Sequence, residues 1–336
     1  MVNIRDIAKK SKVSVATVSH VINRSRHVSD KLISRVEQAM EDLDYQPNLL
    51  AGSLRKKKTG TIGLIIPDNS NMLYADISKN FEDIFFSKNY NIIVGNSAYI
   101  IEREIEHLKN LRSKMVDGIL MIPASTEGEH IGRIRAAGVP VVLLDRKILD
   151  LEVDYVLPDN YQFGYMAGKY LTGLGHKNIG YIDRFQPHYH SIERRKGFKD
   201  ALAKGGITFD DENVLEGGLS YDKGAEAAKK LIQKNKMITA LFSFNDINAL
   251  GAVRGLSDIG LKVPEDISVM GIDDIDISRV FIPSLTTIRY PVKEMVDEAS
   301  RILLNRIKQP VFKKNKEIVI KPELIIREST SAIHTT

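Results

Sequence analysis

The sequence predicts an α/β protein in which a small all-α head precedes a larger body made of two doubly wound lobes. Two patterns support this fold class. Apolar residues recur at helical spacing in the first part of the chain. After Thr61, continuous apolar runs alternate with amphipathic stretches, which is typical of buried parallel strands and the helices that cover them.

The positive charge is concentrated at the N-terminal end. Residues 1–58 contain 12 Lys and Arg against 6 Asp and Glu, whereas the rest of the chain contains 36 against 37. A basic head on a nearly neutral body predicts a polyanion as the partner of the head alone. The charge distribution alone is also compatible with a solvated surface whose asymmetry arose by chance. The sequence motifs distinguish between these two interpretations.

Composition limits the function classes. The 336 residues suffice for two or three domains, and 43% of them are hydrophobic, as in an ordinary globular protein. The absence of cysteine excludes disulfides, thiolate zinc sites and a cysteine nucleophile. The chain lacks both an apolar run of about eighteen residues that would span a membrane and the apolar segment of a secretory signal. We therefore expect a cytoplasmic protein with no membrane partner.

The head contains the pattern of a helix-turn-helix. Asn3 and Asp6 stand at capping-box spacing before a first helix. A second helix is expected to begin at Ser14 and to continue through Asn23, and a third to open at Ser29. Apolar residues of all three face one side, which predicts a small three-helix core.

The outer face of the second helix suggests DNA recognition. In this motif the second helix enters the major groove of DNA, where Val15 and Ala16 suit thymine methyl groups and His20 suits a purine N7 or O6. Short hydroxyl side chains suit phosphate oxygens. The alternatives are a helix cap for Ser14 and an ordinary exposed histidine for His20. The predicted contacts from this helix are Ser14, Val15, Ala16, Thr17, Ser19, His20 and Asn23.

The string VSVATVSHVIN and its surroundings resemble the headpiece of the lactose-repressor/purine-repressor family of bacterial transcription regulators, and the resemblance extends to the C-terminal IIREST. It implies an allosteric repressor that binds double-stranded operator DNA of palindromic sequence as a homodimer, under the control of a small sugar-like effector. It also implies a domain order: a headpiece (1–46), a hinge helix (47–59), an effector-binding and dimerisation domain (60–330) and a tail (331–336). In that domain the N-lobe comprises 60–159 and 291–319, and the C-lobe 160–290 and 320–330.

The segment NLLAGSLRKKKTG matches the family's hinge helix. By resemblance, Leu54 is the leucine that wedges between base pairs in the minor groove, and Arg55 is a minor-groove cation. An isolated helix this short is only marginally stable in water. We therefore expect it to fold only when it packs against DNA and the hinge helix of the second protomer. Gly52 departs from the family's usual ARSL and costs a helix interior about 1 kcal/mol relative to alanine. A flexible basic linker is the alternative.

The body shows two rounds of strand–helix alternation. Helices are expected at 77–88, 102–114 and 127–137, and again at 164–174, 192–204, 222–234 and 249–259. Together with chain crossings near 159–162, 288–291 and 319–322, this order is similar to the periplasmic-binding-protein-like fold, as the family resemblance also implies. The strand-like runs are TIGLIIPD, YNIIVGNS, VDGILMIPA, VPVVLLDR and DYVLPDN, then KNIGYID, ENVLEGGL, ITALFSFND and DISVMGIDD.

Polar residues follow these strands, where ligands bind in open α/β sheets. Carboxylates and amides suit the hydroxyl groups of a sugar, and an arginine can hold a hydroxyl, carboxylate or phosphate group. By resemblance, Arg194 is the ligand-binding arginine and Asn245 and Asp273 bind hydroxyls. The predicted effector-binding residues are Asp68, Asn71, Tyr74, Asp145, Arg146, Arg194, Asn245 and Asp273.

Other polar residues at strand ends are interpreted differently. Asp159, Asn160, Asp246 and Asp274 are taken as helix caps or turn residues. The acidic cluster after the last strand lacks the spacing and glycine of an EF-hand, so no metal is predicted.

The ligand class is limited by two departures from sugar-responsive relatives. They usually have Asn-Pro-Phe where this chain has residues 71–73, and often an aromatic residue where Leu219 stands. A ring that stacks on a sugar face is therefore missing at each place. The candidates to replace it are Tyr74, Phe163, Tyr189 and Phe244.

Three other functional classes compete with a ligand-controlled regulator. An enzyme is not expected, because the sequence has no G-x-S-x-G, Walker A or H-E-x-x-H motif, and no cofactor is predicted. A regulator controlled by a partner protein and a non-catalytic sugar-binding protein remain alternatives. The tail has no heptad pattern, so a dimer without a tetramer-forming coil is expected.

Overall fold

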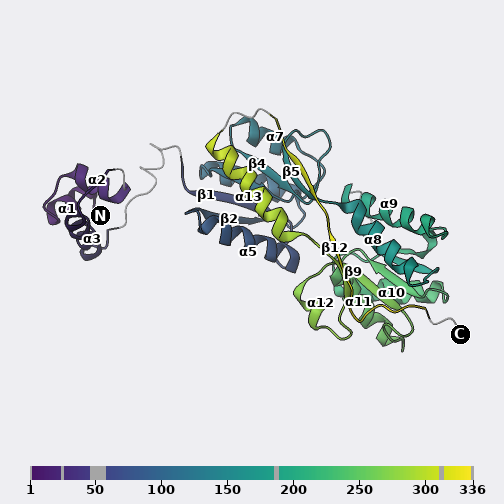
Figure 1. The fold of residues 1–336 in the computed structure, drawn as a ribbon. Coiled ribbons are helices and arrows are strands. Elements are labelled where there is room, and N and C mark those ends of the chain that lie inside the picture. Colours follow the sequence, from purple (N-terminus) through teal and green to yellow (C-terminus); the bar gives the residue numbers. More distant parts are fainter. Residues whose placement is uncertain (1, 24–25, 46–57, 185–188, 310–313, 334–336) are drawn as a thin grey trace. The chain divides into compact units, whose positions relative to one another are not determined.

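The computed structural model describes residues 2–23, 26–45, 58–184, 189–309 and 314–333. The chain forms two compact units, Met1–Thr59 and Gly60–Thr336, which are described separately below. Figure 1 shows the helices of the first unit and the two sheets of the second.

The described residues of the first unit form a head of three helices. Its helices are α1 (Ile4–Lys10), α2 (Val15–Asn23) and α3 (Asp30–Asp42). The predicted capping box is confirmed: the Asn3 side chain accepts a hydrogen bond from the Arg5 N–H (2.8 Å), and Asp6 accepts one from the Asn3 N–H (2.9 Å). The small core consists of Ile7, Ala8, Val18, Val36 and Ala39.

The second unit begins with a parallel sheet in the order β11-β5-β4-β3-β1-β2. Four helices of the described part of the chain belong to this lobe, and α13 crosses one face of the sheet in Figure 1. Its strands are β1 (Thr61–Ile66), β2 (Asn91–Asn96), β3 (Gly118–Met121), β4 (Val141–Leu144), β5 (Asp154–Pro158) and β11 (Glu317–Ile320); its helices are α5 (Met72–Phe86), α6 (Ile101–Ser113), α7 (Glu129–Ala136) and α13 (Val292–Lys308).

The second sheet repeats this arrangement in the order β12-β10-β9-β8-β6-β7, with β12 antiparallel to β10. The chain passes between the sheets from β5 to α8, from β10 to α13 and from β11 to β12. The elements are β6 (Ile179–Asp183), β7 (Val214–Glu216), β8 (Ala240–Ser243), β9 (Ser268–Asp273), β10 (Thr286–Arg289) and β12 (Glu323–Ile325), with helices α8 (Asn160–Gly173), α9 (Tyr189–Lys204), α10 (Tyr221–Lys234), α11 (Asp246–Asp258) and α12 (Asp276–Val280) and the 3-10 turn η1 (Asp211–Asn213).

Four helices, α5, α8, α9 and α11, begin three to five residues earlier than the sequence analysis predicted. α5, α8 and α11 start immediately after polar residues whose side chains accept a backbone N–H of the first turn: Asn71, Asp159 and Asn245. The cap therefore directly follows the strand or its short loop, and the helix N-termini lie at the carboxyl edges of the sheets. α13 was not predicted; its buried face includes Met295, Val296 and Ala299.

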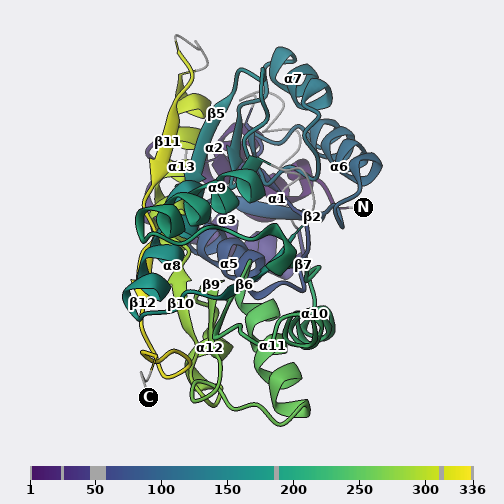
Figure 2. The same cartoon turned by 90° about the vertical axis from the view of Figure 1, so that its right-hand side faces the viewer.

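Helices α8 and α9 lie side by side in Figures 1 and 2 because glycines allow their backbones to touch. A Cβ added to Gly164 would lie 1.8 Å from the Arg194 carbonyl oxygen, and one added to Gly197 would lie 2.0 Å from the Tyr161 carbonyl oxygen. This close crossing fixes the backbone of Arg194 against the start of α8.

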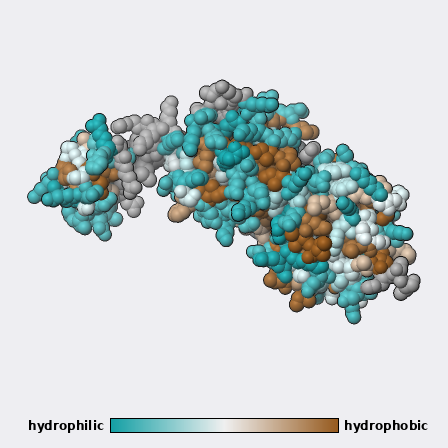
Figure 3. Space-filling model, viewed as in Figure 1, coloured by the Kyte–Doolittle hydropathy of each residue, from teal (hydrophilic) through white to brown (hydrophobic). Residues whose placement is uncertain are grey.

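The surface of the body is mostly hydrophilic on the face shown in Figure 3, with separate hydrophobic areas. Large apolar side chains with high exposure include Phe86 at 77%, Val280 at 70% and Ile282 at 88%. Among the described residues, no helix is long and apolar enough to cross a bilayer.

Replacing Gly164 by Ala should destabilise the body by about 1–3 kcal/mol, because the new methyl group forces two backbones apart. Gly173 lies on the same helix and has no atom within 4 Å of an added Cβ, so Gly173→Ala is the matched control. The control should be neutral or more stable by up to about 1 kcal/mol. Urea unfolding measures both variants, and equal stability of the two would contradict the close crossing.

Candidate functional site

The outward face of α2 carries the residues predicted to contact DNA. Ser14, Val15 and Ala16 are exposed, with Val15 42% exposed, whereas Val18 is fully buried. Thr17, Ser19, His20 and Asn23 are half-buried on the same helix.

Some of these side chains also have local roles. The Ser14 Oγ accepts the Thr17 N–H at 3.1 Å and therefore caps α2 as the alternative interpretation expected. The Asn23 amide donates to the Ser19 carbonyl at 2.8 Å. Leu54 and Arg55, the predicted hinge contacts, lie outside the described residues.

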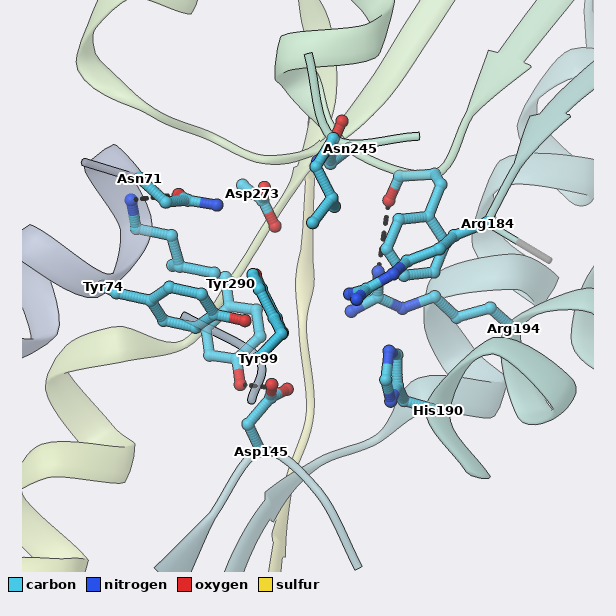
Figure 4. Close-up of a pocket in the computed structure, with 13 residues that line it drawn as sticks. Asn71, Tyr74, Tyr99, Asp145, Arg184, His190, Arg194, Asn245, Asp273 and Tyr290 are labelled. Carbon is cyan, nitrogen blue, oxygen red and sulfur yellow. Dashed lines mark hydrogen bonds between the residues drawn. The ribbon is translucent and has the colours of Figure 1, made fainter. Parts of the chain in front are cut away.

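A cavity lies at the carboxyl ends of the strands, where residues from both sheets converge (Figure 4). The cavity is narrow in this structure, and the volume open to the centres of water molecules is ≈ 30 Å³. It is lined by Asn71, Leu73, Tyr74, Tyr99, Asp145, Arg184, His190, Arg194, Leu219, Phe244, Asn245, Asp273 and Tyr290.

Six of the eight predicted effector residues line this cavity: Asn71, Tyr74, Asp145, Arg194, Asn245 and Asp273. The other two do not. Asp68 instead accepts hydrogen bonds from the Ser70 N–H and hydroxyl, 2.9 and 2.7 Å away, and so shapes the turn before α5. Arg146 is buried behind the lining, where it donates to the Pro123 carbonyl (2.8 Å) and the Tyr74 hydroxyl (3.3 Å).

Asn71 and Asn245 serve as helix caps and line the cavity at the same time. Each Oδ1 accepts a backbone N–H of the following helix, from Leu73 and Asn248 respectively, both at 2.9 Å. The amide –NH₂ of each side chain is the group that remains to donate to a ligand. The structural and binding interpretations of these two residues are therefore compatible.

Arg194 is buried and held by neutral partners. Its Nε donates to the Asn160 Oδ1 (2.9 Å) and its Nη1 to the Phe244 carbonyl (3.1 Å). The guanidinium carbon lies 4.8 Å from the centre of the Phe163 ring and 4.5 Å from that of Phe244, within the range of cation–π attraction. The interpretation of Asn160 as a cap is wrong: Asp159 caps α8, and Asn160 orients Arg194.

The opposite side of the cavity carries carboxyl and phenol groups. The Tyr290 hydroxyl donates to Asp145 at 2.8 Å, and the Arg146 Nε lies 3.5 Å from the other Asp145 oxygen. Burial raises the pKa of Asp273 well above its usual range, and the nearby Asp246 carboxylate adds to the rise. The Asp273 carboxyl group can accept hydrogen bonds from ligand hydroxyl groups in either protonation state.

The backbone is strained at three residues of the lining. Tyr99, Asp145 and Asp273 have φ angles of +60°, +65° and +124°, a region that residues with a Cβ rarely adopt. Asp145 follows β4 and Asp273 ends β9, so the strain lies at the carboxyl edges of the two sheets. Strain of this kind is often found where side chains are held in place for a ligand.

Asp246 is a fully buried structural acid, and Asp274 forms ion pairs in the loop after β9; neither caps a helix. Asp246 accepts hydrogen bonds from Thr287, Ser278 and the Ile275 N–H at 2.6, 2.7 and 3.1 Å, and so ties α11 to α12 and β10. Asp274 binds Arg289 (2.8 Å) and Arg327 (2.5 Å). The sequence interpretation missed these links because their partners are distant in the chain. The described residues include no group of three or more metal-ligating side chains.

The comparisons with known proteins agree with this arrangement. Residues 3–48 match "Bacterial regulatory proteins, lacI family", and residues 169–330 match "Periplasmic binding protein-like domain". The transcriptional repressor PurR of Vibrio vulnificus is 34% identical over 335 residues, which cover 99% of this chain and 100% of that protein. The chain belongs to the lacI family of bacterial regulatory proteins.

Solved structures of the lacI family share the fold of this chain over most or nearly all of its length. The lac repressor dimer bound to operator and the anti-inducer ONPF has a TM-score of 0.85 at 26% identity, with 98% of this chain and 99% of that chain covered. A lacI-family regulator of Enterococcus faecium with bound ribose has a TM-score of 0.75 at 31% identity, with 82% and 100% covered. The relatives named here are transcriptional regulators and not enzymes.

Four lining residues of this lacI-family cavity were not predicted: Tyr99, Arg184, His190 and Tyr290. Arg184 and Tyr290 each directly follow a strand, so the rule that found Asp145 could have found them. Tyr99 and His190 lie on loop and helix positions that no local pattern marks. Of the predicted substitutes for the missing ring, Tyr74 and Phe244 line the cavity, Phe163 lies against Arg194, and the Tyr189 side chain is outside the described residues.

Replacing Asp273 by Gly should give a more stable protein than replacing it by Ala, by about 1–2 kcal/mol, because only glycine adopts a φ of this sign without strain. Both variants remove the same carboxyl group, so the difference isolates the backbone at φ +124°. Thermal unfolding of the two variants measures it. An Ala variant at least as stable as the Gly variant would exclude strain at this position.

Proposed function

We propose that this chain is a transcriptional repressor that binds a palindromic operator as a homodimer, and that a small polyhydroxy effector bound between the lobes controls its affinity for DNA. The observation that carries the proposal is the convergence of polar side chains from both sheets on one cavity. Asn71 and Asp145 belong to the first lobe, and Arg194, Asn245 and Asp273 to the second. The protein is proposed to be non-catalytic and to act in the cytoplasm.

The DNA contacts are proposed for the outward face of α2 and for the hinge segment. Val15 and Ala16 are exposed and apolar, as contacts to thymine methyl groups require, and His20 lies one turn further along the helix. The proposed phosphate contacts and helix-positioning residues are Ser14, Thr17, Ser19 and Asn23. Leu54 and Arg55 are proposed for the minor groove on the basis of the family resemblance.

The homodimer is supported by exposed apolar groups on both lobes. Phe86 at the end of α5, Val280 at the end of α12 and Ile282 nearby are each more than two-thirds exposed. Burial of apolar side chains of this size against a second copy of the chain lowers the free energy of the dimer. The lac repressor, which this chain resembles in fold, is a dimer in its complex with operator.

Control by the effector would act through the relative position of the lobes. A ligand that binds residues of both lobes stabilises the closed arrangement of the lobes. The size of this effect is set by how much more tightly the ligand binds the closed arrangement than the open one. In a dimer, a change in lobe position moves the two headpieces relative to each other. The short hinge helices then form or melt, because each is marginal without its partner and DNA.

Footprinting on the protein's own operator should show two symmetric half-sites protected together, because a dimer presents two α2 helices. The concentration for half-protection should change when the effector is added, and metabolites that co-purify with the protein from its native host supply the effector. Protection of one half-site by a monomer would contradict the proposal.

Replacing Leu54 by Ala should weaken binding to the operator far more than binding to random DNA, because the wedge acts only where the DNA is bent. Lys57→Ala is the matched control. A phosphate contact carries no sequence information, so this control should weaken both kinds of binding about equally. Competition gel-shift assays measure the ratio for each variant, and equal losses with Leu54→Ala would remove the wedge from the proposal.

A further inference from the structure

One wall of the cavity is rich in basic side chains. Arg184, His190 and Arg194, called the basic wall below, point into the cavity from the second lobe in Figure 4. All three are almost fully buried, with relative exposures of 4%, 3% and 3%. Two buried guanidinium groups facing one small cavity are costly unless an anion accompanies them.

The hydrogen-bond acceptors of Arg194 do not neutralise its charge. Its two hydrogen-bond acceptors, the Asn160 side chain and the Phe244 carbonyl, are both uncharged. The rings of Phe163 and Phe244 shield it from water, which strengthens its attraction for a negative group in the cavity. The geometry orients the guanidinium and leaves its charge available.

The backbone of Arg184 is held by the residue before it. The Asp183 Oδ1 accepts the Arg184 backbone N–H at 2.7 Å, while its Oδ2 binds the Arg195 side chain. The Arg184 guanidinium lies over the Tyr99 ring at 4.8 Å, and that of Arg146 lies 5.2 Å from the same ring. Burial lowers the pKa of Arg184, and the positive charge of Arg146 lowers it further.

The acids that line the cavity do not balance the basic wall. Among the described residues these acids are Asp145 and Asp273. Asp145 is engaged by Tyr290 and lies beside Arg146, which is a third buried arginine. Burial raises the pKa of Asp273, and the charge of Arg194 opposes this rise. The region around the cavity therefore carries more positive than negative charge.

We infer that the effector is a polyhydroxy compound that carries an anionic group, a carboxylate or a phosphate, bound by Arg184 and Arg194. The inference rests on the proposed function and narrows the effector to one class. The planar fork of each arginine matches the oxygens of such a group, and an anion removes the repulsion between the buried guanidinium groups. The acid and amide groups opposite, Asp145, Asn245 and Asp273, bind the hydroxyl groups.

The test compares matched ligands on the full-length chain by isothermal titration calorimetry. Each neutral sugar is paired with its acid and its phosphate: glucose with glucuronate and glucose 6-phosphate, galactose with galacturonate and galactose 6-phosphate, and ribose with ribose 5-phosphate. At least one anionic member should bind about tenfold or more tightly than its neutral counterpart. The acid and phosphate arms show which anion the basic wall prefers.

Arg184→Gln should abolish this preference, so that the anionic and neutral members of the pair bind with similar affinity. Arg254→Gln is the control, because Arg254 lies on the surface of α11 with its side chain 78% exposed and pairs with Asp258. The control should leave the preference unchanged. Circular dichroism checks that both variants are folded.

The inference is overturned if neutral sugars bind as tightly as their anionic counterparts, or if no anionic member of the panel binds. A neutral sugar that binds and alters the operator footprint would overturn the inference and leave the proposed function intact. Failure to protect a symmetric operator under any condition would instead overturn the proposed function.

Discussion

The position of Arg194 depends on three contacts that join separate parts of the body. Its backbone lies against Gly164 of α8, its Nε binds Asn160 at the first crossing between the lobes, and its Nη1 binds the carbonyl that precedes the α11 cap. None of these partners is charged. A buried cation held in this way is oriented by the protein and still requires an anion or a polar ligand to offset the loss of hydration. The cavity, the crossing and the close packing of α8 against α9 are therefore linked through one side chain.

The same arrangement connects ligand binding to lobe position. Asn160 lies where the chain leaves the first sheet, and Tyr290, which donates to Asp145 of the first lobe, lies at the second crossing. A ligand that engages Arg194 and Asp145 together would contact residues that are tied to two of the three crossings. Lobe closure then needs no long pathway through the core, because the residues that touch the ligand are next to the segments about which the lobes rotate.

Much of the fold follows from local pattern, and much of the site follows from one rule of sheet topology. The apolar runs predicted the main strands because parallel strands are buried on both faces. Asn71, Asn245 and Asp273 were identified because the carboxyl ends of parallel strands meet at one edge. The starts of α5, α8 and α11 were missed because their polar caps resemble loop residues. Asn160 and Asp246 were misinterpreted because their partners, Arg194 and Thr287, are distant in the sequence and no local pattern indicates such contacts.

The departures from sugar-responsive relatives acquire a physical meaning in this cavity. Leu219 lines it where an aromatic residue is common, so one stacking surface for a neutral sugar ring is absent. In its place the cavity has Tyr99, whose ring lies beneath the Arg184 and Arg146 guanidinium groups and therefore faces cations. Stacking on a sugar face contributes through apolar contact, whereas buried arginines contribute through charge. A cavity that lacks a stacking ring and has buried arginines selects ligands by charge more than by ring shape. Matched neutral and anionic sugars therefore separate the contribution of charge from that of stacking.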